Sequence, residues 1–157
     1  MSTMVIASTD GKDKNPMKEN NTTRSSNEIN KLLANSECLV LLAHGSKDPQ
    51  WRVPFERIVD AVQGQSGKTK VRLAYMEFIE PTLMDVAREC VGQQISHLRI
   101  LPLFLSIGAH LATDVPEQVN QAKAKFPQLE IELLAPVGKD PRLAGLIQQI
   151  VIETLSH

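Results

Sequence analysis

The sequence has no hydrophobic run that approaches the roughly 18 to 20 residues needed to cross a bilayer. It also has no surplus of one charge, because 17 basic and 18 acidic residues leave a formal net charge of −1. These two absences predict a soluble protein without a membrane span. They also exclude nucleic acid and anionic membrane surfaces as expected partners, since both require a basic excess.

Cysteine is scarce as well. Cys38 and Cys90 are the two cysteines of the chain, and no CxxC pair or secretory leader accompanies them. Cys38 lies in an apolar stretch and Cys90 in an amphipathic one, which is typical of buried thiols in a reducing compartment. We therefore expect a cytoplasmic protein.

Several catalytic motifs are missing. Neither GxxxxGK[ST] nor GxGxxG occurs, so a nucleotide phosphate cradle is not supported. Gly45-Ser46 is not part of a GxSxG nucleophile elbow. Histidine phosphatases use Arg-His-Gly, but Ala43 stands in the arginine position before His44. A small phosphohydrolase that uses His44 stays open as a further hypothesis. Such an enzyme would hydrolyse phosphate esters in the presence of a metal chelator and would not need Glu77.

The composition divides the chain into two parts. Residues 1–36 are rich in Ser, Thr, Asn and Lys and predict a disordered tail. Acidic residues within this tail argue against an organelle transit peptide. Residues 37–157 predict a single α/β domain, and about 120 residues are enough for one hydrophobic core.

From residue 37 onward, a unit of strand followed by helix occurs four times. The expected strands are 38–42, 70–78, 98–105 and 130–136, and the expected helices are 53–63, 82–91, 114–125 and 143–155. An acidic residue and a proline mark each helix entry, and Asp114 and Glu117 resemble a capping pair for the third helix. The alternation predicts an α/β fold with a four-stranded parallel sheet, helices on both faces and a flavodoxin-like strand order of 2-1-3-4.

Two histidines and a glutamate fall where this fold holds ligands. His44 follows the first strand, Glu77 ends the second, and His110 ends the apolar run of the third. The first and third strands are neighbours in the expected order, and the direction of the chain connections reverses between them. The two imidazoles would therefore share the crevice that such a reversal creates at the carboxyl ends of the strands. Imidazoles with a carboxylate suit Co, Fe, Ni or Zn. A lone histidine is more often an ordinary loop residue, and His97 and His157 are expected to be solvated.

Polar residues near the two histidines are candidates for holding an anionic ligand. Ser46, Lys47 and Arg52 follow His44, and Ser106 precedes His110. Such side chains near helix starts can bind carboxylates or phosphates. Helix capping and ordinary surface charge explain each of them equally well when it is considered alone.

Three motifs together resemble a known family. Leu-Ala-His44-Gly-Ser, Tyr-Met-Glu77-Phe-Ile-Glu-Pro and Leu-Pro-Leu-Phe-Leu-Ser-Ile-Gly-Ala-His110-Leu-Ala-Thr-Asp-Val-Pro resemble the class II tetrapyrrole chelatases. The chain is most similar to short sirohydrochlorin chelatases of the CbiX/SirB type. The resemblance implies that His44, Glu77 and His110 serve metal binding and catalysis. It further implies insertion of Co²⁺ or Fe²⁺, with Ni²⁺ as a variant, into sirohydrochlorin for cobalamin or sirohaem synthesis, without an organic cofactor.

The resemblance also implies partners. Longer chelatases of this class carry two facing lobes, whereas this chain carries one, so a symmetric homodimer is expected. Ser46, Lys47, Arg52 and Ser106 would hold the carboxylates of the tetrapyrrole rim. A non-catalytic metal or tetrapyrrole carrier with the same cleft is the alternative hypothesis. The sequence lacks the His-rich tail or Cys-rich extension of some relatives, which leaves metal storage and iron–sulfur roles unsupported.

Overall fold

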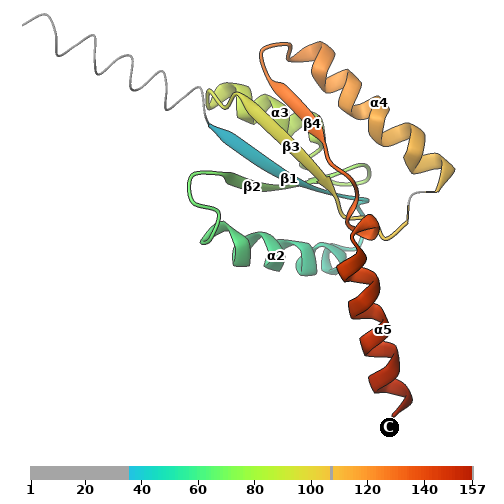
Figure 1. Cartoon of the computed structure of the whole chain (residues 1–157). Helices are drawn as coiled ribbons and strands as arrows, with labels where there is room; N and C mark the ends of the chain where they lie inside the picture. The colour runs from blue at the N-terminus through green and yellow to red at the C-terminus, as the bar shows by residue number, and fades with distance from the viewer. Residues whose placement is uncertain (1–35, 107, 157) are drawn as a thin grey trace, which may run out of the picture.

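The computed structural model describes residues 36–106 and 108–156. The expected disordered tail of residues 1–36 lies outside the described residues, apart from Ser36, and stays a prediction. The helices and strands, in chain order, are β1 (Glu37–Ala43), the 3-10 turn η1 (Pro49–Arg52), α2 (Val53–Gln63), β2 (Lys70–Tyr75), α3 (Leu83–Gly92), β3 (His97–Pro102), α4 (Ala109–Lys125), β4 (Glu130–Leu133), the 3-10 turn η2 (Val137–Lys139) and α5 (Pro141–Leu155) (Figure 1).

The four strands form one parallel sheet in the order β2-β1-β3-β4, which confirms the predicted topology. Leu41 of β1 lies beside Leu73 of β2 on one side and Leu101 of β3 on the other. All carboxyl ends of the strands therefore open at the same edge of the sheet. The residues that follow β1, β2 and β3 meet at this edge.

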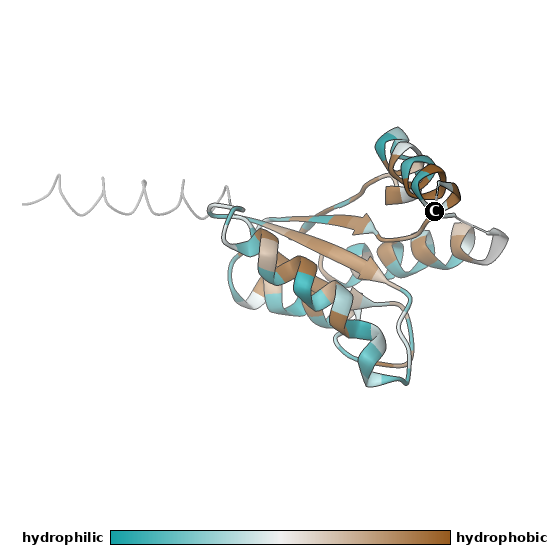
Figure 2. Ribbon diagram, turned by 90° about the horizontal axis from the view of Figure 1, so that it is seen from below, coloured by the Kyte–Doolittle hydropathy of each residue, from teal (hydrophilic) through white to brown (hydrophobic). Residues whose placement is uncertain are grey.

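The hydrophobic core lies on one face of the sheet, beneath α3 and α4. Strand residues that point to this face are almost fully buried, and much of the sheet has hydrophobic colours in Figure 2. The central core residues are Cys38, Val40, Leu42, Ala74, Leu83, Val86, Ala87, Cys90, Leu98, Ile100, Val115, Val119, Ala122 and Ile131. The prediction of buried thiols is confirmed, and hydrogen bonding to Cys90 together with burial raises the pKa of Cys38, so this thiol stays protonated.

The opposite face is covered only in part. α2 packs against β2, where Val71 and Tyr75 are buried, so helices lie on both faces as predicted. α5, by contrast, extends away from the sheet and makes its main contacts with η2 (Figure 1). No helix in the described part of the chain has the length and hydrophobicity of a membrane span.

The third helix begins earlier than predicted. α4 starts at Ala109 with Gly108 as its N-cap, and Pro116 lies inside the helix instead of at its entry. Leu111, Val115 and Val119 pack on the core at helical spacing, and this buried stripe outweighs the one backbone hydrogen bond that Pro116 removes. The Asp114 and Glu117 capping pair is therefore wrong. β2, β3 and β4 each end three residues before the predicted position.

α3 is capped by a reciprocal pair of side chains. The Thr82 backbone N–H donates to Asp85 Oδ2 at 3.0 Å, and the Asp85 N–H donates to Thr82 Oγ1 at 3.3 Å. Hydrogen bonds from Thr82 and from Arg88 lower the pKa of Asp85 from 3.8 to about 2. Because the folded-state pKa is depressed, the ionised carboxylate adds stability above pH 4, and this contribution is lost as the pH falls toward 2.

An Asp85→Asn variant should therefore lose about 1 kcal/mol of unfolding free energy at pH 7. The deficit should shrink as the pH is lowered from 5 toward 3, because Asp85 then binds a proton in the unfolded wild-type chain while it stays mostly ionised in the folded one. Urea denaturation of both proteins across this range measures the difference. A deficit that is constant with pH would contradict the role of the ionised carboxylate.

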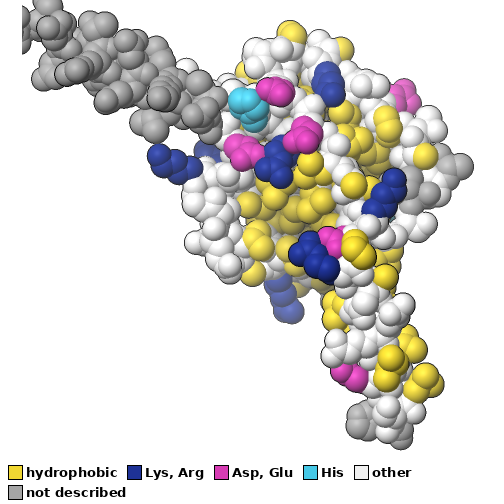
Figure 3. Space-filling view, in the orientation of Figure 1, with side chains coloured by type: hydrophobic (Ala, Val, Ile, Leu, Met, Phe, Trp, Pro, Cys, Tyr) yellow, Lys and Arg dark blue, Asp and Glu magenta, His cyan; other side chains and the backbone are white. Residues whose placement is uncertain are grey.

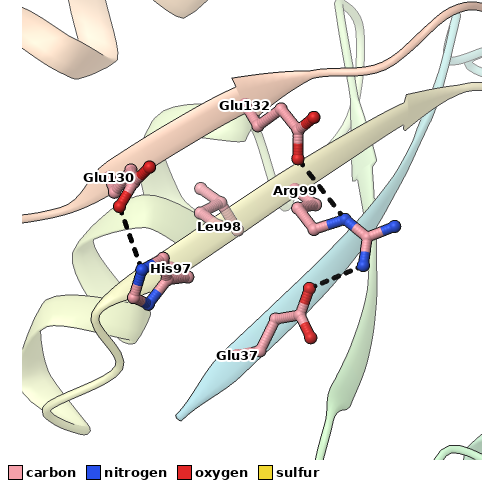
Figure 4. A pocket seen from close by; sticks show the side chains of 6 residues that line it. All are labelled: Glu37, His97, Leu98, Arg99, Glu130 and Glu132. Atoms are coloured by element: carbon pink, nitrogen blue, oxygen red, sulfur yellow. Dashed lines mark hydrogen bonds and ion pairs between the residues drawn. The ribbon is translucent and has the colours of Figure 1, made fainter. Parts of the chain in front are cut away.

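A charged cluster occupies the amino end of the strands, on the face opposite the core (Figure 4). His97 Nε2 lies 2.9 Å from Glu130 Oε2, and Arg99 lies 2.7 Å from Glu37 and 3.5 Å from Glu132. A small cavity of 230 Å³ separates these side chains. His97 is 44% exposed, so it is partly solvated as expected, but its ring nitrogen also contacts the Glu130 carboxylate. His157 lies outside the described residues.

Candidate functional site

His44 is positioned by the end of β1 and by the loop that follows β2. The backbone N–H of Met76 donates to the carbonyls of Ala43 (3.0 Å) and His44 (3.1 Å), and the N–H of Glu77 donates to the same His44 carbonyl at 3.1 Å. These bonds continue the pairing of β1 and β2 beyond the sheet. They hold the backbones of His44 and Glu77 side by side at the carboxyl edge.

Gly45 makes this close approach possible. Its φ is +101°, and a Cβ at this position would lie 2.0 Å from the Glu77 carbonyl oxygen. No L side chain fits at that distance, and the left-handed backbone favours glycine as well. In the sequence, Gly45 stands out only as the neighbour of His44. Its role depends on the approach of Glu77, which lies 32 residues away in the sequence.

The side chains of His44 and Glu77 face each other across a short gap. His44 Nδ1 lies 3.9 Å from Glu77 Oε1, too far for a hydrogen bond, and both side chains are about half exposed. Two atoms that each lie about 2.1 Å from one tetrahedral metal ion are about 3.4 Å apart. A small side-chain rotation would therefore let His44 and Glu77 bind the same ion.

The ring of Phe104 supports the His44 imidazole. The two ring centroids are 5.1 Å apart with an interplanar angle of 60°, an edge-to-face contact, and Phe104 itself is buried. This contact restricts the orientation of the imidazole while leaving it accessible. Phe104 was missed from sequence, although its place in the apolar run just after the third strand could have marked it.

His110 is the second residue of α4, so it lies in the first turn of a helix and not at the end of a strand as predicted. α4 follows β3, the neighbour of β1, and begins on the carboxyl side of the sheet. The His110 side chain lies outside the described part of the structure. Among the described residues, no group of three or more His, Cys, Asp or Glu side chains could hold a metal. The three-ligand set of His44, Glu77 and His110 stays a prediction.

The four predicted anion-binding residues have different surroundings. The Ser46 hydroxyl oxygen accepts from the Asp48 N–H at 3.1 Å, and Arg52 Nε lies 3.1 Å from Glu56. Ser46 thus stabilises a turn and Arg52 forms a surface ion pair, which are the alternatives to anion binding considered for these residues. Lys47 Nζ lies 5.8 Å from the centroid of the Phe78 ring, and Ser106 is exposed in the β3–α4 loop.

Exposed apolar side chains lie beside these polar groups. Phe78 is 59% exposed with φ +69°, and Leu105 is 68% exposed. Each follows the end of a strand at the carboxyl edge. Both residues fall inside the predicted strands 70–78 and 98–105, so their exposure was not expected. The site therefore combines a histidine and a carboxylate with accessible hydrophobic surface.

Comparisons with known proteins match this part of the chain. The family model described as CbiX matches residues 38–154. A sirohydrochlorin cobaltochelatase from Methanopyrus kandleri is 25% identical over 139 residues, covering 76% of this chain and 97% of the relative. A chloroplastic sirohydrochlorin ferrochelatase from Arabidopsis thaliana is 26% identical over 125 residues, which cover 80% of this chain and 56% of the relative. The chain thus spans little more than half of the plant protein.

Solved structures share the fold. A CbiX protein from Marinobacter aquaeolei VT8 is 35% identical, with a TM-score of 0.68 and coverage of 76% of this chain and 98% of that one. The sirohydrochlorin chelatase SirB from Bacillus subtilis subspecies spizizenii, solved in complex with cobalt, has 21% identity and a TM-score of 0.66, and 50% of its chain is covered. At that identity, SirB supports the fold alone. The family match over residues 38–154 and the 35% identity to a CbiX protein show that this chain belongs to the CbiX family.

Proposed function

We propose that this protein is a sirohydrochlorin chelatase that inserts Co²⁺ or Fe²⁺ into the tetrapyrrole. The observation that carries the proposal is the accessible pair of His44 and Glu77, held side by side at the carboxyl edge of the sheet. Relatives named as sirohydrochlorin cobaltochelatases and ferrochelatases support the substrate. Nickel is a variant of the same proposal, because one imidazole and carboxylate set accommodates all three metals.

The chemistry of metal insertion matches these side chains. The ion must lose its hydration shell, the macrocycle must bend, and two pyrrolic protons must leave. A neutral imidazole can bind a metal of intermediate softness or accept a proton near neutral pH. His44 would perform one of these steps and His110 the other, and Glu77 would balance the charge or carry protons outward.

The surroundings of His44 suit a flat, polyanionic macrocycle. Phe78 and Leu105 offer apolar contact, and Phe104 keeps the imidazole oriented. Lys47 and Ser106 would bind rim carboxylates directly, whereas Ser46 and Arg52 would do so by exchanging the partners that they have now. A homodimer is part of the proposal, because one lobe would cover only part of the macrocycle. A cytoplasmic location is also part of it and is in keeping with the two buried free thiols.

A Lys47→Ala variant tests the rim contact. Lys47 is exposed, so its loss should raise the KM for sirohydrochlorin about two- to five-fold and leave kcat nearly unchanged. Steady-state kinetics at low and high salt measure the effect, which should diminish as salt increases. Lys123→Ala, an exposed lysine in the last turn of α4, is the control with no expected change. Equal KM values for both variants would exclude Lys47 from the rim.

The activity itself is tested with purified protein, sirohydrochlorin and Co²⁺. The absorbance change of metal insertion should be faster than in the protein-free mixture, and more than one equivalent of product should form per chain. One equivalent of bound tetrapyrrole or metal without turnover would favour the carrier alternative. Hydrolysis of a phosphate ester in chelator would favour the phosphohydrolase instead.

A further inference from the structure

Gln118 places a polar side chain within the buried stripe of α4. Val115 and Val119 on this stripe are 4% and 3% exposed, Ala122 is fully buried, and all three pack on the core. Gln118 falls among them at helical spacing and is half-buried. A polar side chain in such a position needs a hydrogen-bond partner, because an amide that loses its water without one is costly. The identity of the partner therefore indicates the role of Gln118.

The partner of Gln118 is a backbone carbonyl in the loop between β2 and α3. Gln118 Nε2 donates to the Met76 carbonyl oxygen at 3.3 Å, across 42 residues of sequence. The Met76 side chain is partly buried and packs against the same core as α4. This contact joins α4 to the loop that carries Glu77.

The Met76 carbonyl belongs to the peptide unit that precedes Glu77. In this unit, the Glu77 N–H donates to the His44 carbonyl at 3.1 Å, and the Met76 C=O accepts from Gln118. The N–H and C=O of a trans peptide unit point in opposite directions. The unit is therefore held from both sides, by the end of β1 on one side and by α4 on the other.

The second hydrogen bond restricts a motion that the first one allows. A peptide unit held only through its N–H can rotate about that bond, and this rotation would change the direction in which the Glu77 side chain leaves the backbone. Gly45 already lies in close contact with the Glu77 carbonyl, so the loop cannot relax toward β1. The bond from Gln118 opposes rotation from the other side. Both contacts together orient the Glu77 carboxylate toward His44, 3.9 Å away.

The helix that holds this peptide unit also carries His110. α4 is continuous from Ala109 to Lys125, and Gln118 lies eight residues after His110. This separation is about 12 Å along the axis of the helix. The contact of Gln118 with the loop therefore sets the position of Glu77 relative to the backbone of His110 as well as to His44.

We propose that Gln118 is a positioning residue for the metal site, because it fixes the Met76–Glu77 peptide unit between β1 and α4. The inference rests on the proposed function, since it concerns the place where the metal substrate would bind. In this role Gln118 contacts neither the metal nor the tetrapyrrole. Its loss should loosen Glu77 without removing a ligand.

A Gln118→Met variant tests the hydrogen bond. Methionine has a similar length, is compatible with a helix and lacks the amide donor, so the variant should keep the wild-type circular dichroism. Hydrogen exchange of the Glu77 amide should become about two- to ten-fold faster, as expected for the loss of one hydrogen bond. Gln121→Met is the matched control, since Gln121 is exposed on the same helix. Equal exchange rates in wild type and Gln118→Met would overturn the inference.

The affinity for Co²⁺ distinguishes a positioning role from a purely structural one. Every chain in this titration carries His97→Ala, because His97 and Glu130 are in contact at the amino end of the sheet and can bind Co²⁺ themselves. Figure 3 shows acidic and histidine side chains exposed in that region. In this background, Gln118→Met should weaken Co²⁺ binding about two- to ten-fold, as measured by calorimetry. Gln121→Met should leave the affinity unchanged.

Combination with Glu77→Ala completes the test. Glu77→Ala alone should weaken Co²⁺ binding, and addition of Gln118→Met should cause no further loss, because the side chain that Gln118 positions is then absent. A further loss of the same size in the double variant would show a purely structural role and overturn the inference. If Glu77→Ala weakens binding but Gln118→Met does not, the inference alone fails. If Glu77→Ala binds Co²⁺ like its parent, the metal site of the proposed function fails, whatever the effect of Gln118→Met.

Discussion

A His44→Ala variant is expected to insert Co²⁺ into sirohydrochlorin at least about 100-fold more slowly than wild type. The imidazole would act as metal ligand or proton acceptor, and removal of such a group typically costs a factor of 10² to 10⁴. Stability should change little, because the side chain is 46% exposed and its described contacts are the Phe104 edge and Glu77 at 3.9 Å. The initial rate of the absorbance change, followed in parallel with urea denaturation, measures both quantities.

His97→Ala is the matched control for this experiment. His97 is 44% exposed and also faces a glutamate, but it lies at the amino end of the sheet. Its loss should leave the insertion rate unchanged. His110→Ala should be slow like His44→Ala if the predicted convergence of the two imidazoles holds. An unchanged rate for His44→Ala would remove the basis of the proposed function.

Gly45→Ala is expected to destabilise the protein by about 3 kcal/mol or more and to abolish insertion. The new methyl group would lie 2.0 Å from the Glu77 carbonyl oxygen, at a φ of +101° that alone costs about 1 to 3 kcal/mol. Relief of this clash must separate the two backbones that position His44 and Glu77. Urea denaturation gives the loss of stability, and the insertion rate of the remaining folded protein gives the effect on the site.

Gly64→Ala provides the comparison for that variant. Gly64 follows α2 with a φ of −66°, and no atom lies within 4 Å of an added Cβ. Its replacement should be neutral or slightly stabilising, since alanine reduces the freedom of the unfolded chain. Equal stabilities for the Gly45 and Gly64 variants would show that the contact with Glu77 does not constrain the loop.

The sheet and its strand order were predictable because four apolar runs alternate with helical patterns of suitable length. The ends of the elements were less predictable. Pro116 was read as a helix entry, but burial of Leu111 and Val115 extends α4 in front of it. β2 ends at Tyr75 and β3 at Pro102, although the apolar runs continue to Phe78 and Leu105, so the runs alone do not mark the strand ends.

The site was predictable to the extent that topology determines it. Parallel strands bring their carboxyl ends together, so His44 and Glu77 were expected at one edge, and the structure places them 3.9 Å apart. Gly45 and Phe104 were not assigned roles, because each contacts a residue distant in sequence: Gly45 approaches Glu77, and Phe104 packs on His44. His110 was placed at a strand end, but it begins a helix.

Crystals soaked with Co²⁺ would show whether a divalent metal binds at His44 and Glu77. Anomalous scattering at the cobalt edge should give a peak about 2.1 Å from a His44 ring nitrogen and near Glu77. The peak should vanish in His44→Ala crystals and persist in His97→Ala crystals. A peak confined to the His97 and Glu130 cluster, or no peak at His44, would contradict the account.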